Sequence, residues 1–337
     1  MGVIVLGVLP LAEKSLIAQI RRRAGKAAGP LQLGIGDDAA VVKIPPGREL
    51  LVTTDFSLEG VHFRRAWHSP DSVGHRCLAR GLSDIAAMGG VPLAAFLSLA
   101  LPAKLPQKWV DGFLRGLLAL ARKHGVGLAG GDTAQSPGSP SEAKILADIV
   151  VVGAVPAGKS VPRSGAKPGD LIYVTGALGA SAATLEKMYI HPEKKLNPGK
   201  YPQHFFPEPR VAVGKFLSER GTTNAMIDLS DGLSTDLDHL CQESGVAARL
   251  FAELIPQAKG ATLLQALHGG EDYELLFTVP ARRKAPRSIA GVPITRIGEI
   301  LSGRRSASRM ELAQQGGSTE RLRPLGWEHF ALARRPR

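Results

Sequence analysis

The chain has 337 residues, 44% hydrophobic and 21% charged, a composition that is typical of globular proteins and excludes an intrinsically disordered chain. Its formal net charge of +12 raises the question of a nucleic-acid partner, but only 5% of the residues are aromatic, which disfavours a base-stacking surface. The length allows two domains of ordinary size.

In the first half of the chain, helical and strand patterns alternate. Apolar residues that recur every three or four positions predict helices, and short apolar runs that end in glycine or aspartate predict strands. The predicted helices span 12–23, 71–88 and 106–124, and the predicted strands span 50–54, 92–101, 126–129 and 145–155. A polar loop is expected at 134–144. The Pro/Gly-rich segment 161–169 is interpreted as the connection between two domains, 12–155 and 156–337.

The second half of the chain continues this alternation. Strands are predicted at 171–175, 247–250, 271–279 and 294–300, and a further strand is predicted to end just before Asp228. Helices are predicted at 180–188, 209–219, 233–244 and 261–267. Segment 191–204 is expected to be a mobile loop, and 302–323 an exposed hairpin or loop. Helices that alternate with strands in both halves predict an α/β class with α+β character, in which helices flank mixed sheets.

Basic residues, cysteines and the apolar first residues narrow the class of protein further. The basic runs at 21–23, 282–284, 304–305 and 334–337 have no interleaved aromatic residues, which favours a solvated surface or the attraction of anionic metabolites and leaves nucleic-acid binding as an alternative. Cys77 and Cys241 lack metal-ligand spacing, which predicts reduced core residues of a cytoplasmic protein. Residues 1–11 are apolar but too short to span a bilayer, so we expect no membrane association.

Acidic residues recur beside small or hydroxyl-bearing residues, mostly at predicted strand ends. The clusters are 37–38, 53–55, 83–84, 131–133 and 228–231. Each one alone is most simply a turn or a helix cap. Together they offer hard oxygen ligands without accompanying Cys or paired His, which favours Mg²⁺ or Mn²⁺ over zinc. Because several Mg²⁺ ions usually serve nucleotide phosphates, the clusters predict metal-assisted phosphoryl transfer without a covalent nucleophile.

Two glycine-rich segments are weaker candidates for phosphate binding. Residues 153–160 match the P-loop pattern, but Pro156 interrupts the loop and Pro162 follows where a helix must begin, so we expect a turn. Residues 176–179 precede a predicted helix and could cradle a phosphate at its N-terminus. Close packing of the strand against the helix explains these glycines equally well.

Seven segments, in order along the chain, resemble the thiamine-monophosphate kinase family, whose superfamily contains aminoimidazole ribonucleotide synthetase and selenophosphate synthetase. They are 34–40, 53–55 with 60–63, 82–89, 130–133, 163–170, 227–232 and 269–275. The resemblance implies the two-domain fold of aminoimidazole ribonucleotide synthetase and a homodimer formed through the N-terminal domain. It also implies direct in-line transfer of the ATP γ-phosphate to thiamine monophosphate, with thiamine diphosphate and ADP as products.

By position, the resemblance assigns a role to each motif residue. The metal ligands would be Asp37, Asp38, Thr53, Thr54, Asp55, Asp84, Asp132, Asp228 and Asp231. ATP would contact Gly131, Asp132, Arg163 and Ser230, and thiamine monophosphate would contact His62, Glu271 and Trp327. The flat face of a tryptophan suits the cationic thiazolium ring or the pyrimidine of such a substrate.

Other members of the superfamily fit the chain less well. Selenophosphate synthetase would need a reactive cysteine near its N-terminus, and no cysteine precedes Cys77. Aminoimidazole ribonucleotide synthetase remains the alternative enzyme, disfavoured by residues 60–63 and by Trp327. From a different class, a basic nucleic-acid-binding protein would explain the charge but not the carboxylates, which repel a phosphate backbone unless metals intervene.

Overall fold

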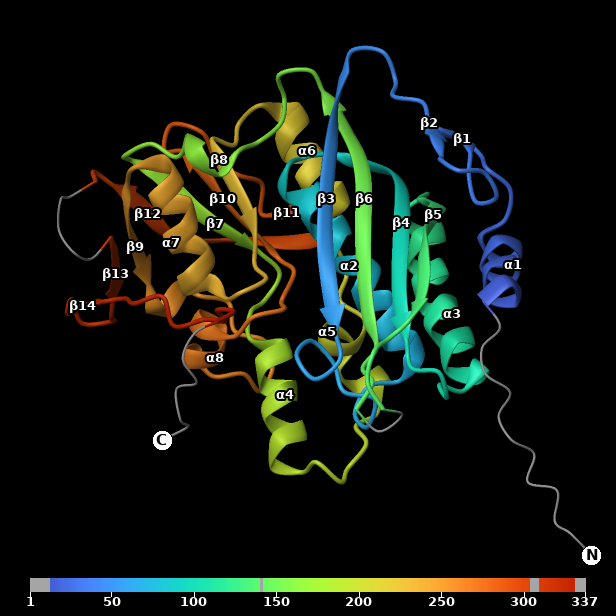
Figure 1. Ribbon diagram of the computed structural model, residues 1–337. Helices are drawn as coiled ribbons and strands as arrows, with labels where there is room; N and C mark the ends of the chain where they lie inside the picture. The colour runs from blue at the N-terminus through green and yellow to red at the C-terminus, as the bar shows by residue number, and fades with distance from the viewer. Residues whose placement is uncertain (1–12, 140–141, 304–308, 331–337) are drawn as a thin grey trace, which may run out of the picture. The chain divides into compact units, whose positions relative to one another are not determined.

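The computed structural model describes residues 13–139, 142–303 and 309–330. The chain divides into two compact units, of which the first ends at Ala154 and the second begins at Val155 and also includes Ala86–Val91. Helices accompany β-sheets in both units, so the predicted α/β class is confirmed (Figure 1). Across these described ranges, no helix is both long enough and apolar enough to cross a membrane.

The first unit is built on a four-stranded sheet in the order β3-β6-β4-β5. Its strands are β3 (Arg48–Leu58), β4 (Val91–Leu101), β5 (Gly127–Gln135) and β6 (Leu146–Pro156). Two short strands, β1 (Leu31–Leu33) and β2 (Val41–Val42), form a separate antiparallel pair. The helices are α1 (Glu13–Ala24), α2 (Pro70–Ala87) and α3 (Gln107–Lys123). Figure 1 shows α2 and α3 on one face of this sheet.

Helices α2 and α3 pack with their backbones in close contact because glycines lie at the crossing. A Cβ atom at Gly116 would lie 1.8 Å from the carbonyl oxygen of Asp71, and one at Gly74 would lie 1.9 Å from that of Phe113. Leu78 of α2 is fully buried. The crossing fixes α2, which carries Asp84, against the sheet.

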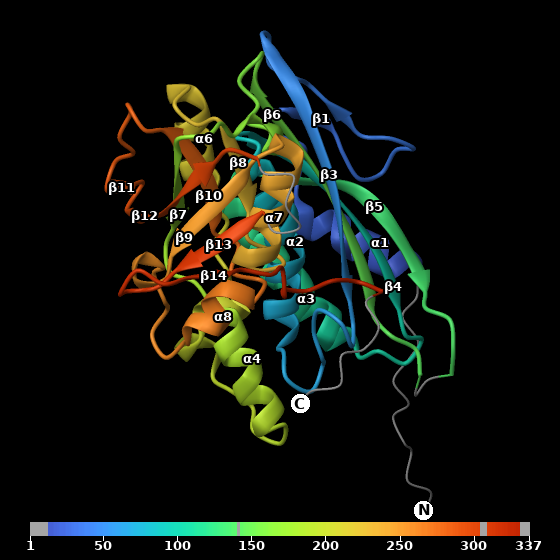
Figure 2. The same ribbon diagram turned by 90° about the vertical axis from the view of Figure 1, so that its left-hand side faces the viewer.

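The second unit contains an eight-stranded sheet in the order β14-β13-β9-β12-β7-β10-β8, with β11 paired to β12. The strands are β7 (Asp170–Thr175), β8 (Ala225–Asp228), β9 (Ala247–Phe251), β10 (Leu275–Pro280), β11 (Ser288–Ile289), β12 (Val292–Leu301), β13 (Met310–Ala313) and β14 (Thr319–Arg321). The pairing of β13 with β9 is parallel, whereas the pairs β9–β12, β12–β7, β7–β10 and β10–β8 are antiparallel. Both views place β13 and β14 beside β9 at one edge of the sheet (Figure 1 and Figure 2).

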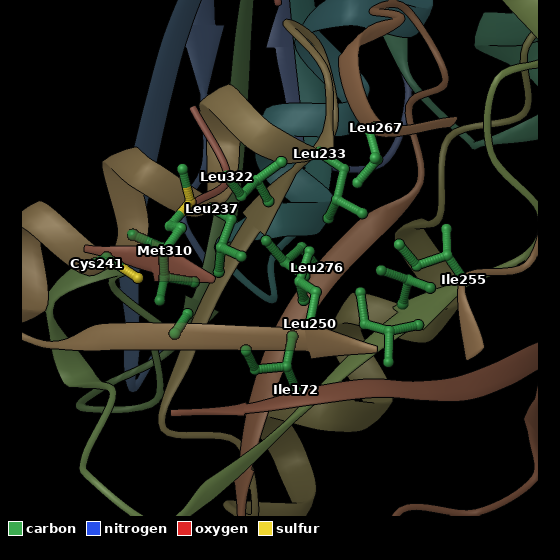
Figure 3. Packing of buried hydrophobic residues seen from close by; sticks show 14 of the residues in the cluster. Ile172, Leu233, Leu237, Cys241, Leu250, Ile255, Leu267, Leu276, Met310 and Leu322 are labelled. Carbon is green, nitrogen blue, oxygen red and sulfur yellow. The ribbon is translucent and has the colours of Figure 1, made fainter. Parts of the chain in front are cut away.

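The helices of the second unit include the helix that follows the 228–231 cluster. They are α4 (Ala180–Ile190), α5 (Pro202–Phe205), α6 (Val211–Arg220), α7 (Leu233–Ser244) and α8 (Leu263–His268), with the short 3-10 helices η1 (Arg163–Gly165), η2 (Pro198–Lys200) and η3 (Ala252–Leu254). Leu233, Leu237 and Cys241 recur every four residues along α7 and face the sheet. They pack in one core with Ile172 and Leu276 of the sheet (Figure 3).

The prediction of free, buried cysteines is confirmed. Cys77 and Cys241 are both unpaired with another cysteine and fully buried. Burial raises the pKa of each thiol to about 12, which keeps both thiols protonated at neutral pH. These side chains are therefore core residues.

Several predicted element boundaries are wrong, and neighbouring strands explain the largest differences. The strands with Asp55 and Asp132 do not end there, because β3 continues to Leu58 and β5 stays paired with β4 as far as Gln135. Strand β10 begins at Leu275 instead of 271, after backbone turns at 271 and 273.

Segment 191–204, which was predicted to be a loop, contains η2 and the start of α5. In 302–323, β13 and β14 form the predicted hairpin, apart from 304–308. The apolar residues 1–11, positions 140–141 of the expected loop and the basic residues 304–305 and 334–337 lie outside the described residues.

Candidate active site

Three of the predicted metal ligands lie together in the first unit. Because side chains alternate along a strand, Thr53 and Asp55 of β3 point to the same face, and α2 brings Asp84 to that face. The Thr53 hydroxyl donates a hydrogen bond to the carboxylate of Asp84. Asp55 also contacts this carboxylate and lies 3.6 Å from Nη2 of Arg80.

The electrostatics of this cluster favour a bound cation. Burial raises the pKa of Asp55 to about 7, the nearby charge of Asp84 acts in the same direction, and Arg80 opposes both. Two adjacent carboxylates can both be ionised only if a positive charge compensates them. Carboxylate and hydroxyl oxygens are hard donors of the kind that Mg²⁺ prefers, so these residues fit that ion.

Thr53, Asp55 and Asp84 alone do not complete the coordination of a metal ion. Within the part of the chain that the structure describes, no three His, Cys, Asp or Glu side chains are arranged as a group that could hold a metal ion. Mg²⁺ often takes only one or two carboxylates from the protein and completes its coordination with water and substrate phosphates. The geometry therefore suits a metal ion that arrives with a nucleotide.

The other predicted residues of the first unit lie apart from the Thr53 cluster. Thr54 points to the opposite face of β3, where its hydroxyl donates a hydrogen bond of 2.7 Å to Asp148. Asp37 and Asp38 are exposed in the segment between β1 and β2. Asp132 is exposed on β5, and its carboxylate accepts a 2.8 Å hydrogen bond from the backbone N–H of Thr133.

Gly131 and His62 have local structural roles beside their predicted ones. A Cβ atom at Gly131 would lie 1.8 Å from the carbonyl oxygen of Leu97, so β4 and β5 approach each other as only glycine permits. The Nδ1 atom of His62 accepts a 3.0 Å hydrogen bond from the backbone N–H of Leu58 at the end of β3. This bond places the proton of a neutral imidazole on Nε2.

In the second unit, two loops from distant parts of the chain are joined by backbone hydrogen bonds. The N–H of Glu271 donates to the carbonyl oxygen of Ser230 at 2.8 Å, and that of Tyr273 donates to Leu229 at 2.9 Å. Glu271 and Tyr273 have φ angles of 65° and 51°, a left-handed conformation that is costly for residues other than glycine. This backbone conformation holds Glu271 beside the predicted ATP and metal residues Ser230 and Asp231.

The C-terminal segment brings Trp327 to the same place. The N–H of Trp327 donates to the carbonyl oxygen of Asp231 at 3.0 Å, and the N–H of Gly326 donates to the Thr235 hydroxyl at 3.0 Å. A Cβ atom at Gly326 would lie 2.0 Å from that Asp231 oxygen, so glycine is required for this contact. Trp327 is 52% exposed, and its ring makes an edge contact with that of His329, with 5.6 Å between the ring centroids.

Asp228 and Asp231 have a third acidic neighbour, Asp236, which the sequence did not single out. Oδ2 of Asp236 accepts hydrogen bonds from the N–H groups of Asp231 at 3.1 Å and Gly232 at 3.0 Å. Burial raises the pKa of Asp236 well above its usual value, and the charges of Asp228 and Asp231 add to this rise. The sequence could have indicated Asp236, because it lies in the first turn of the predicted helix 233–244, and carboxylates commonly accept hydrogen bonds from the free N–H groups there.

Arg163 and Ser230, which were both predicted to contact ATP, lie far apart in the second unit. Arg163 lies in η1, where its carbonyl oxygen accepts a 2.7 Å hydrogen bond from the hydroxyl of Ser244 at the end of α7. Ser230 precedes the start of α7, and a helix of 12 residues is about 18 Å long. The two residues therefore lie at opposite ends of α7.

The two glycine-rich segments are not built as phosphate loops. Residues of the P-loop pattern lie in β6 and a turn, and the next helical element is η1 at Arg163, as expected. At the start of α4, the N–H of Gly179 already donates to Oδ2 of Asp272 at 2.8 Å. Burial raises the pKa of Asp272 to about 7. A protein carboxyl group therefore takes the place that a phosphate would need.

A buried ion pair anchors the end of the 269–274 loop. Glu274 is 5% exposed and accepts hydrogen bonds from Nε of Arg210 at 2.6 Å and from Nη2 at 2.5 Å. The Thr175 hydroxyl donates to the same carboxylate at 2.5 Å. These bonds fix the point at which the loop enters β10.

Comparisons with known proteins identify the family to which the chain is similar. Two family models match: the N-terminal domain of AIR synthase related proteins over residues 36–158 and their C-terminal domain over 167–311. Thiamine-monophosphate kinase of Salmonella typhimurium is 38% identical over 304 residues, which cover 86% of this chain and 90% of that protein.

Two solved structures resemble the chain throughout. Thiamine-monophosphate kinase of Stenotrophomonas maltophilia is 34% identical with a TM-score of 0.75, covering 90% of this chain and 96% of that one. A second structure, described as AaThiL complexed with AMPPCP and TMP, is 32% identical with a TM-score of 0.73 and covers 95% and 97%. The chain therefore belongs to the thiamine-monophosphate kinase family of AIR synthase related proteins.

Proposed function

We propose that this chain transfers the γ-phosphate of ATP to thiamine monophosphate and releases thiamine diphosphate and ADP. The observation that carries the proposal is the cluster in which Ser230 and Asp231 bind the backbones of Glu271 and Trp327. It joins residues suited to a metal-bound nucleotide with residues suited to a cationic ring. Relatives named thiamine-monophosphate kinase and the complex with AMPPCP support the assignment. We assign the reaction to the cytoplasm, where ATP is supplied.

We assign the predicted acidic set to Mg²⁺. The Thr53, Asp55 and Asp84 cluster and the Asp228 and Asp231 loop would hold metal ions, with Asp37, Asp38, Thr54 and Asp132 as further proposed ligands. Bound Mg²⁺ would neutralise charge on the phosphate oxygens and orient them for in-line displacement. Arg80 compensates part of the negative charge that Asp55 and Asp84 carry when no metal is bound.

The substrate supplies its own nucleophile, so the protein needs no covalent one. A phosphate oxygen of thiamine monophosphate is already anionic at neutral pH and can attack the γ-phosphorus of ATP directly. The protein then contributes position and charge, which are the main requirements of phosphoryl transfer. We assign Gly131, Arg163 and Ser230 to contacts with ATP, and His62, Glu271 and Trp327 to contacts with the substrate.

Substrate choice is the sharpest test of this function. The purified protein is incubated with Mg-ATP and either thiamine monophosphate or free thiamine, and the products are separated by chromatography. We expect thiamine diphosphate and ADP in equal amounts, and only from the monophosphate. Phosphorylation of free thiamine, or no product from either compound, would contradict the proposal.

Replacing Trp327 with alanine is expected to raise the KM for thiamine monophosphate by about tenfold, with a smaller effect on kcat. A cation over an indole ring gains up to about 2 kcal/mol when desolvated, and the alanine variant loses this contact. Steady-state kinetics checks the result. Trp327→Phe serves as the matched control, because it keeps an aromatic face and should retain most of the affinity. A KM that does not change in Trp327→Ala would remove this residue from the substrate site.

We also propose that the protein is a homodimer formed through the first unit. Leu50, Val52 and Phe56 point to one face of β3, an edge strand of its sheet, and are 47%, 63% and 59% exposed. An apolar row on an exposed edge strand favours association and is rarely left uncovered in a monomer. A second copy of the chain is the partner that the family resemblance implies.

The dimer proposal predicts the effect of adding charge to this row. Val52→Glu combined with Phe56→Glu is expected to give monomers at concentrations where the wild-type chain is dimeric, because two carboxylates would have to be buried. Light scattering coupled to size exclusion measures the mass. Leu264→Glu is the control, since Leu264 of α8 is 69% exposed but lies in the second unit. A monomeric wild-type protein would refute the proposal.

A further inference from the structure

We propose that a cavity in the first unit, separate from the Thr53 cluster, binds a small organic phosphate. The cavity has a volume of about 450 Å³ and lies among the end of α1, the segment that leads through β1, and the turn after α3. This volume lies within the range of small-molecule sites. The inference does not depend on the phosphoryl transfer proposed above.

Three cationic side chains from three different segments line the cavity. They are Arg21 of α1, Lys26 of the following loop and Arg122 near the end of α3. Among residues 13–139, 142–303 and 309–330, none of these side chains has an ion pair or hydrogen bond. Asp37, one of the further proposed Mg²⁺ ligands, also lines the cavity, so three positive charges face one negative charge. Like charges that share a cavity repel each other, and a bound anion would relieve this repulsion.

Part of the remaining lining, which also includes Gln32 and several glycines, is apolar and suits the organic part of such a ligand. Leu31, Val126 and Leu128 line the cavity but are only 5%, 6% and 4% exposed, whereas Leu33, which also lines it, is 40% exposed and offers apolar surface to a ligand. An inorganic anion would leave this surface in contact with water, whereas a ring or short chain would cover it. The combination of cations and an apolar wall therefore favours an organic phosphate over free phosphate.

The walls of the cavity are held in place by contacts outside it. Arg23 of α1 forms an ion pair of 2.9 Å with Asp111 of α3, and Gln107 of α3 donates a 2.7 Å hydrogen bond to Gln19 of α1. Arg21 lies against the backbone of Gly36, where a Cβ atom would come within 2.5 Å of its guanidinium carbon. A site that is already formed loses less conformational entropy when a ligand binds.

Calorimetric titration of the whole protein tests the inference. Phenyl phosphate is the probe, inorganic phosphate is the comparison, and EDTA is present to prevent metal-dependent nucleotide or phosphate binding. We expect phenyl phosphate to bind more tightly than inorganic phosphate. Arg21→Ala and Arg122→Ala should each weaken phenyl phosphate binding about tenfold, the loss of one charge-assisted contact. Arg22→Ala is the matched control, because Arg22 is exposed beside Arg21 but does not line the cavity.

Further outcomes separate this site from the proposed transfer site. Asp231→Asn, which alters the second unit, should leave phenyl phosphate binding unchanged. Loss of binding in Asp231→Asn would place the probe elsewhere and overturn the inference. Unchanged binding in both Arg21→Ala and Arg122→Ala, or the same weakening in Arg22→Ala, would also overturn it. Equal affinity for inorganic and phenyl phosphate would refute the organic part of the assignment.

Discussion

Replacing Asp84 with asparagine is expected to lower kcat for thiamine monophosphate and Mg-ATP by about 100- to 1,000-fold, as is typical when one preorganised electrostatic group is removed. Asp84 accepts the hydrogen bond from Thr53 and lies beside Asp55, so it connects the ligands that β3 and α2 contribute. Asparagine keeps the shape of the side chain but removes one negative charge from the proposed metal set. Steady-state turnover at saturating ATP measures the effect.

The Asp84→Asn variant should remain folded, because it also relieves the repulsion between Asp84 and Asp55. Circular dichroism and the midpoint of thermal unfolding check this. Asp238→Asn is the control, since Asp238 lies on α7 in the second unit and accepts a hydrogen bond from the exposed side chain of Gln242. Near wild-type turnover by Asp84→Asn would remove this residue from the metal set.

Replacing Glu274 with alanine is expected to lower the free energy of unfolding by about 3–5 kcal/mol, the usual cost of breaking a buried ion pair from one side. The substitution leaves the guanidinium of Arg210 without its carboxylate and leaves the Thr175 hydroxyl without its acceptor. Because Glu274 ends the 269–274 loop, we also expect Glu271 to lose its fixed position. Urea unfolding monitored by circular dichroism measures the loss of stability.

The control for Glu274→Ala is Glu219→Ala on α6. Glu219 pairs with Lys215 at 3.8 Å, and both side chains are about half exposed. An exposed pair of this kind contributes about 0.5 kcal/mol or less. A loss of stability in Glu274→Ala no larger than that in Glu219→Ala would contradict the structural role of the buried pair.

The spacing of apolar residues was enough to predict helices that bury one apolar face and end at a local signal such as glycine. The helix at 233–244 has the predicted boundaries because its apolar residues repeat every three or four positions and a glycine follows at 245. The strands around Asp55 and Asp132 were predicted too short. Their glycines and aspartates resemble turns in isolation, but pairing with neighbouring strands keeps the backbone extended.

The contacts that assemble the site depend on the tertiary fold. Nothing in the local sequence indicates that the N–H of Trp327 meets the carbonyl oxygen of Asp231, or that Glu271 adopts a positive φ beside Ser230. The resemblance supplied the names of these residues but not their hydrogen bonds. Asp148, which accepts the hydrogen bond of Thr54, lies in none of the motifs recognised in the sequence. Such partners become visible only when β6 is placed beside β3.

The metal dependence of product formation tests the central claim most directly. The protein is stripped of divalent ions with EDTA, exchanged into metal-free buffer, and assayed for thiamine diphosphate with ATP and thiamine monophosphate before and after Mg²⁺ is restored. We expect no product without the ion and full turnover on its return, because the carboxylates act through a bound cation. Thiamine diphosphate formed at the same rate in the stripped protein would contradict the role assigned to the acidic residues.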